Sequence, residues 1–245
     1  MISFLCPTRG RPENVSTLMR SALETASNPR DLEFVFYVDK DDKHTYQRLV
    51  SNPLFIVTVP DGKEHEVQTR WVGGERIVLS QMWNECYKVA TGPFYYHMGD
   101  DNVFQTDGWD TQLLEAFEKY PDRILFAHGK DGSPHDATGF GTHGVIHKNW
   151  VETVGYFVPP YFSSDYNDTW LNEVSRAIGR HVCLDYMVEH MHPNFGKAEF
   201  DQNHQERLAR QQADNVDGEY WSRATEREAD AQKLREFIIN YREPF

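Results

Sequence analysis

The chain lacks the cysteine pattern of a disulfide-stapled or zinc-binding protein. Its three cysteines, Cys6, Cys86 and Cys183, lie far apart in the sequence, and none belongs to a CxxC pair. An odd number of cysteines at such spacings is typical of buried free thiols in a reducing compartment. We therefore predict neither a disulfide framework nor a zinc site, and we assign no function to these residues.

Long apolar runs and a targeting segment are also missing. No run approaches the ~18 apolar residues of a membrane span, and Met1 leads directly into ISFLC without a basic region or a cleavage site. The hydrophobic fraction of 39%, with 15 Phe, 12 Tyr and 6 Trp, nevertheless excludes a disordered chain. We expect a globular, cytoplasmic protein without a membrane span.

Positive charge is scarce in this chain. It has 25 Lys and Arg against 38 Asp and Glu, which gives a formal net charge of −13. Because a nucleic-acid backbone repels an acidic surface, this balance disfavours nucleic acid as a partner, although an acidic protein can still hold a local basic groove. Nothing in the sequence indicates the oligomeric state.

Short apolar segments of strand length alternate with segments of helical periodicity. The first strand is predicted for 2–6, where Pro7 ends the apolar run, and a helix begins near Pro12. A later helix has an apolar stripe that includes Leu79, and Gly92 closes it. The other predicted elements are, in order, strands 34–38 and 55–59, helix 110–120, strand 123–128, helix 168–178 and strand 182–190. This alternation predicts an α/β fold with a mainly parallel central sheet and helices on both faces.

The length of the chain suits one α/β domain followed by a tail. From about residue 205 the composition shifts to charged helix formers, as in ATEREADAQKLREF. We predict a domain over 1–204 and a helical C-terminal extension over 205–245, which packs on the domain or on a partner.

Polar residues follow three of the predicted strands. Ligands of open α/β sheets bind beyond the carboxyl ends of the strands. The planar fork of an arginine suits a diphosphate, and an aspartate can accept a hydrogen bond from a base N–H or a ribose hydroxyl. Each residue alone could equally belong to a solvated turn, but together they predict a nucleotide site. Its predicted residues are Pro7, Thr8, Arg9, Arg11, Asp39, Arg76, Asp100 and Asp101.

The acidic pair stands at fixed intervals from an upstream helix. Asn84 is followed by Ala90 after six residues and by Gly92 after eight, and the segment Gly99–Asn102 (GDDN) begins seven residues later. In these intervals the chain resembles glycosyltransferase family 2, the inverting enzymes of the Rossmann-like GT-A fold. The resemblance implies a D-x-D motif, a nucleotide-binding half over about 1–102 and an acceptor half over about 103–204.

Within this motif, the resemblance makes Asp101 the usual metal ligand. Gly99 stands where the family has its first aspartate. Whether Asp100 takes over the contact to the ribose or to the metal side is left open. The resemblance further implies a divalent cation, Mn²⁺ or Mg²⁺, and a nucleotide diphosphate sugar as donor, with UDP favoured.

Two downstream matches extend the resemblance to about 200 residues. Asp168 precedes a helix at the family's position for the general base, with Asp165 as a competitor; capping of the helix N-terminus is the structural alternative for Asp168. In EHMHP, His192 matches a histidine that joins the metal, whereas His190 fits this role less well and a structural role better. The glycine-rich segment 129–144 would face the acceptor.

The sequence therefore predicts a metal-dependent, inverting hexosyl- or pentosyltransferase, from a bacterium or encoded by a virus and then acting in the host cytoplasm. Its acceptor is a hydroxyl group of unknown class. One alternative is a catalytically silent nucleotide- or glycan-binding domain, because Gly99 replaces a motif aspartate. The other is a metal-dependent nucleotide-sugar phosphohydrolase or nucleotidyltransferase, although TRGRPEN is a poor match to the glycine-rich phosphate loop of nucleotidyltransferases.

Overall fold

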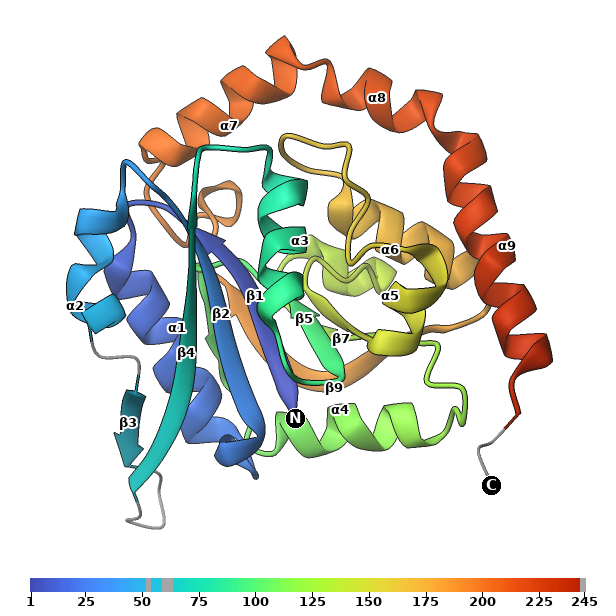
Figure 1. Cartoon of the computed structure of the whole chain (residues 1–245), viewed down its shortest axis with the longest axis horizontal. Helices are drawn as coiled ribbons and strands as arrows, with labels where there is room; N and C mark the ends of the chain where they lie inside the picture. Colours follow the sequence, from blue (N-terminus) through green and yellow to red (C-terminus); the bar gives the residue numbers. More distant parts are fainter. Residues whose placement is uncertain (52–53, 59–63, 243–245) are drawn as a thin grey trace.

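The computed structural model describes residues 1–51, 54–58 and 64–242, and it places one mixed sheet between two layers of helices (Figure 1). The described strands are β1 (Ile2–Thr8), β2 (Leu32–Asp39), β3 (Leu54–Thr58), β4 (Glu64–Gly74), β5 (Phe94–His97), β6 (Asn102–Phe104), β7 (Phe126–Lys130), β8 (Gly144–His147) and β9 (His181–His190). The described α-helices are α1 (Pro12–Thr25), α2 (Gln47–Ser51), α3 (Leu79–Val89), α4 (Trp109–Glu118), α5 (Lys148–Val154), α6 (Asn167–Ala177), α7 (Gln202–Ala213), α8 (Val216–Ser222) and α9 (Ala224–Asn240).

The strand order is β3-β4-β2-β1-β5-β8-β7-β9-β6. Strands β4, β2, β1 and β5 run parallel and form the parallel part of the sheet, although β4 was not among the predicted strands. The rest of the sheet is mixed, because β8 pairs antiparallel with both β5 and β7, and β3 and β6 are antiparallel edge strands. The predicted α/β class is confirmed, but the sheet is less parallel than expected.

Alternation along the central strands builds a core on each face of the sheet. Phe4 and Cys6 of β1 pack in one core with residues of α1 and α4, and Leu5 packs in the other with residues of α3, α5 and α6. All residues of β2 are buried because this strand has neighbours on both edges and helices on both faces. The prediction that helices cover both faces is confirmed.

Several local predictions were wrong. β1 continues through Pro7 to Thr8, because β5 pairs with it only as far as Leu5, so the missing N–H of Pro7 costs no ladder bond on that side. α3 ends at Val89; Gly92 instead lets the chain approach Met1, whose carbonyl oxygen would lie 2.8 Å from an added Cβ.

One of the three thiols differs from its prediction, and the third predicted strand is described only in part. Cys183 is an exposed free thiol, not a buried one, while Cys6 and Cys86 are free and buried as expected. β3 agrees with the strand expected at 55–59, but residue 59 and the predicted end at Pro60-Asp61-Gly62 lie outside the described residues.

The C-terminal helices α7, α8 and α9 run as an arc around the outside of the molecule (Figure 1). α9 packs against α5 and α6, and its buried Asp230 accepts hydrogen bonds from Tyr156 and from Trp170 Nε1, the latter at 3.2 Å. Within the part of the chain that the structure describes, no helix is both long enough and apolar enough to span a bilayer.

Candidate functional site

A cavity of about 230 Å³ opens beyond the carboxyl ends of β1, β2, β4 and β5. It forms there because parallel strands deliver the residues that follow them to one edge of the sheet. The lining residues include all eight of the predicted nucleotide site, namely Pro7, Thr8, Arg9, Arg11, Asp39, Arg76, Asp100 and Asp101. His143 and His192 line it as well, together with Asn203, His204, Arg207 and Arg210 of α7.

Asp101, His143 and His190 form a cluster at this edge that could hold a metal ion. One donor atom from each lies within 4.8 Å of the others, and His190 Nε2 is 3.4 Å from Asp101 Oδ2. Strand register brings them together: Gly144, next to His143, pairs with His97 of β5, and His190 pairs with Asn102. Sequence reasoning missed His143 because β8 was not predicted.

The absence of a side chain at position 99 makes room for this cluster. A Cβ on Gly99 would lie 2.8 Å from Asp101 Oδ1 and 3.1 Å from His143 Nε2. The space that a side chain at 99 would enter is thus taken by two members of the cluster. An aspartate at position 99, as in the usual motif, would therefore compete for space with His143.

His192 lies next to the cluster and outside it. β9 ends at His190, and His192 caps the short 3-10 helix Pro193–Phe195, its Nδ1 accepting a hydrogen bond from Asn194 N–H at 3.2 Å. The rings of His190 and His192 are 5.1 Å apart. Metal binding by His192 stays a prediction.

Asp100 and Asp101 have different hydrogen-bond partners, and their pKa values therefore shift in opposite directions. Asp100 accepts hydrogen bonds from Thr8 Oγ1 at 2.7 Å and from Arg11 Nη1 at 3.2 Å. Burial, and then the charge of Asp101, nevertheless raise the pKa of Asp100 to about 6. Burial is also the largest single effect on Asp101 and acts to raise its pKa, but the hydrogen bond with His190, together with the charges of His190, His143 and Arg11, lowers the pKa overall. As pH falls through about 6, Asp100 therefore becomes protonated while Asp101 stays ionised.

Asp39 is a buried acceptor with a free oxygen. Its Oδ2 accepts from Arg9 Nη1 at 2.8 Å, and its Oδ1 is buried without a hydrogen-bond partner among the described residues. Burial raises the pKa of this carboxyl although Arg9 and Arg76 lower it. A buried oxygen without a donor marks a place where a ligand N–H or O–H can bind.

Asp168, the predicted base, and its competitor Asp165 are both absent from the lining of this cavity. Asp165 forms an ion pair with Arg207, which does line it. Asp168 lies in the first turn of α6, where Tyr166 is the N-cap, and its Oδ1 accepts from Thr169 N–H at 2.7 Å. Burial raises the pKa of Asp168 to about 6.

The C-terminal helices hold the segment that carries these two aspartates. Tyr166 stacks on Tyr220 of α8 at 4.3 Å, and its hydroxyl donates to Asp217 at 2.9 Å. The guanidinium of Arg223 lies 4.0 Å from the ring centre of Tyr161. The extension therefore packs on the segment that carries Asp165 and Asp168, a contact that the sequence did not specify.

Solved structures share this fold at low sequence identity. TarS 1-349 of S. aureus with UDP-GlcNAc matches with a TM-score of 0.57 and 12% identity, over 97% of this chain and 71% of that chain. The mannosyltransferase PcManGT of Pyrobaculum calidifontis with GDP-Man and Mn²⁺ matches with a TM-score of 0.56 and 15% identity, over 96% and 69%. TarS 1-349 with UDP matches with a TM-score of 0.56 and 12% identity, over 76% of this chain.

In its match to the UDP complex, the chain spans 59% of the length of TarS 1-349. No family model matches the sequence, and neither does any curated protein. The likeness shows that the chain shares its fold with these glycosyltransferases, in agreement with the fold predicted from the GDDN segment and its spacing.

Proposed function

We propose that this protein transfers a sugar from a nucleotide diphosphate sugar, with UDP as the favoured nucleotide, to a hydroxyl acceptor. The observation that carries the proposal is one cavity at the strand ends that is lined by Asp39, several arginines and two members of the cluster, Asp101 and His143. The third member, His190, lies 3.4 Å from Asp101. Solved structures of the same fold hold UDP-GlcNAc, or GDP-Man with Mn²⁺. In this proposal 1–102 is the nucleotide-binding half, 103–204 the acceptor half and 205–245 an extension.

The donor set of the cluster fits a divalent cation. One carboxylate and two imidazoles suit Mn²⁺ better than Mg²⁺, which prefers oxygen ligands. Asp101, His143 and His190 would hold the ion, with His192 as a further candidate. When bound, the ion supplies Lewis-acid stabilisation of the negative charge that develops on the leaving diphosphate.

The other walls of the cavity supply complementary groups for a nucleoside. The free Oδ1 of Asp39 can accept the imide N–H of uracil or the N–H groups of guanine. Asp100, held by Thr8 and Arg11, can accept a hydrogen bond from a ribose hydroxyl. Both bases therefore remain compatible with the site, and UDP is the first nucleotide to test.

Asp168 is the proposed general base. In a single displacement it takes the proton of the acceptor hydroxyl, which attacks the anomeric carbon, while the bond to the diphosphate breaks and the configuration inverts. A pKa near 6 leaves the carboxylate ionised at neutral pH and still basic enough to accept this proton. Asp165 is the weaker candidate because its carboxylate is engaged by Arg207.

The test is a panel of UDP-, GDP- and dTDP-sugars incubated with the protein and Mn²⁺, with products identified by mass spectrometry. Release of nucleoside diphosphate with transfer or hydrolysis of the sugar is expected, and Asp101→Asn should reduce it by about 10²–10³-fold. Asp107→Asn, at an exposed position, is the matched control. A folded protein that consumes no donor would contradict the proposal.

Two other functions would give different results in the same assay. A phosphohydrolase would release sugar 1-phosphate and a nucleoside monophosphate, and a nucleotidyltransferase would release sugar 1-phosphate and a nucleoside triphosphate when pyrophosphate is added. A catalytically silent binding domain, which the glycine at position 99 favours, would bind a nucleotide by calorimetry without consuming any donor.

A further inference from the structure

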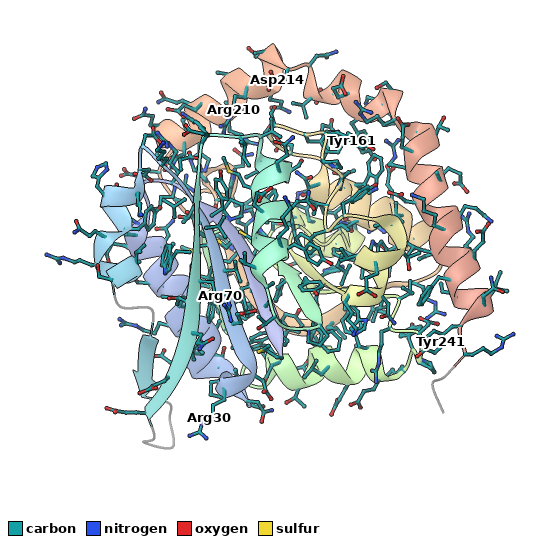
Figure 2. All side chains as sticks on the ribbon, viewed as in Figure 1. Arg30, Arg70, Tyr161, Arg210, Asp214 and Tyr241 are labelled. Carbon is teal, nitrogen blue, oxygen red and sulfur yellow. The ribbon has the colours of Figure 1, made fainter. Side chains whose placement is uncertain are left out.

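Helix α7 presents a basic face to the cavity. Asn203, Arg207 and Arg210 line it at spacings of four and three residues, which place them on one side of the helix. Asn203 Nδ2 donates to the carbonyl oxygen of Arg9 at 2.7 Å and so fixes α7 against the loop that follows β1. The basic face of α7, defined here as Arg207 and Arg210, was not predicted as part of the site. Figure 2 marks Arg210 on this helix.

The arginines from the first half of the chain are already paired with carboxylates of the protein. Arg9 bonds Asp39 and also Asp41, the latter with both Nη atoms at 2.8 Å. Arg11 bonds Asp100 and Asp201, with Nη2 at 2.7 Å from Asp201 Oδ2. Arg76 pairs with Glu206 of α7. These pairs leave little free positive charge on that side of the cavity for an anionic ligand.

The two arginines of the basic face of α7 have fewer hydrogen-bond and ion-pair partners. The Nε atoms of Arg207 and Arg210 are both buried without a hydrogen-bond partner among the described residues. Arg207 uses Nη1 for Asp165, whereas the side chain of Arg210 has no hydrogen bond or ion pair within the described part of the chain. Burial, and then the charge of Arg76, lower the pKa of Arg210, as expected for a cation that lacks an anionic partner.

We propose that Arg210, assisted by Arg207, binds the diphosphate of the nucleotide, so that α7 closes the donor site from the C-terminal extension. Two buried N–H donors one turn apart suit an anion with several acceptor oxygens, and guanidinium groups bind phosphate oxygens through paired hydrogen bonds. This inference rests on the proposed nucleotide-sugar function and assigns a part of it to residues outside the predicted domain 1–204.

The test compares UDP with UMP, and GDP with GMP, by calorimetry on the Mn²⁺-loaded full-length chain. Arg210→Ala should weaken binding of the diphosphate by about tenfold or more, because a hydrogen-bonded charge is lost, and should weaken binding of the monophosphate less. Arg207→Ala should act in the same direction. Arg235→Ala is the matched control, because it removes the same charge from α9, where Arg235 pairs with Glu228 outside the cavity.

The possible outcomes separate the two proposals. If the wild type binds a nucleotide and Arg210→Ala binds it equally well, or loses UDP and UMP affinity to the same extent, the α7 inference is overturned and the proposed function stands. If the wild type binds neither UDP nor GDP, both are overturned. Thermal unfolding of each variant identifies losses of binding that come from misfolding. Arg210→Lys then repeats the comparison with the positive charge kept. If this variant is folded and binds UDP as well as the wild type, the proposed role of the paired guanidinium hydrogen bonds is also overturned.

Discussion

Gly99 is the residue at which the candidate metal site departs from the usual motif. An added Cβ would meet Asp101 Oδ1 and His143 Nε2, so Gly99→Ala should weaken Mn²⁺ binding by about 10–100-fold, the range seen when the surroundings of metal ligands are disturbed. Gly73→Ala is the control, because nothing lies within 4 Å of an added Cβ there. Titration of Mn²⁺ by calorimetry measures both. Equal affinities would show that His143 and Asp101 do not form the site together.

The raised pKa of Asp168 predicts that the transfer rate falls at low pH, whereas the contribution of this residue to the stability of the fold rises at low pH. Its raised pKa means that transfer should fall as pH drops through about 6, where the base becomes protonated, and Asp168→Asn should lose about 10²–10⁴-fold of the rate at pH 7.5. Because the folded-state pKa is above the ordinary value, the stability that protonated Asp168 contributes is present below about pH 4 and lost as pH rises through 6.

Asn keeps the acceptor for Thr169 N–H without ionising, so Asp168→Asn should be the more stable protein above pH 6 and lose this advantage at pH 4. Thermal unfolding at several pH values measures the difference. A constant difference between the two proteins, or an unchanged rate, would contradict the assignment of Asp168 as a partly buried base.

At the residue scale, the sequence pointed to those residues of the cavity lining that stand at the end of a strand or directly follow it. Asp39 and Asp100 could be found because the end of an apolar run marks the binding edge of the sheet. His143 could not, because its place depends on the antiparallel pairing of β8 with β5. Arg210 could not either, because only the folded path of the tail brings α7 back over the cavity.

Elements were predicted well where their apolar residues followed one period. α4, α6 and β9 lie within a few residues of the predicted segments. β4 was missed because its sequence, EHEVQTRWVGG, mixes charged and apolar residues; it lies between β2 and the edge strand β3. β6 and β8, with three and four residues, are too short to show a period.

The packing of α9 on the domain can be tested by substituting its buried Asp230. Asp230→Ala removes the acceptor of Tyr156 and of Trp170 Nε1 and should lower the free energy of unfolding by about 1–3 kcal/mol. Urea unfolding measures this change. Asp214→Ala, at an exposed position after α7, should change it by less than about 0.5 kcal/mol. Equal effects of the two substitutions would mean that α9 is not held at this point.

At the scale of the whole molecule, an acidic chain encloses a cavity lined by five arginines, Arg9, Arg11, Arg76, Arg207 and Arg210. The fold forms this cavity because four parts of the chain meet at one edge of the sheet. They are the ends of the parallel strands, the turn before β8, the end of β9 and helix α7. The central claim is that a divalent cation and a nucleotide diphosphate bind together in this cavity.

The most direct measurement of this claim is calorimetric titration of UDP and GDP into the protein with and without Mn²⁺. Two ligands that contact each other in one cavity strengthen each other's binding, so Mn²⁺ should raise the affinity for at least one nucleotide by about 5–150-fold. Asp101→Asn should remove this enhancement. An affinity for both nucleotides that is the same with and without Mn²⁺, or an enhancement that survives Asp101→Asn, would contradict the account.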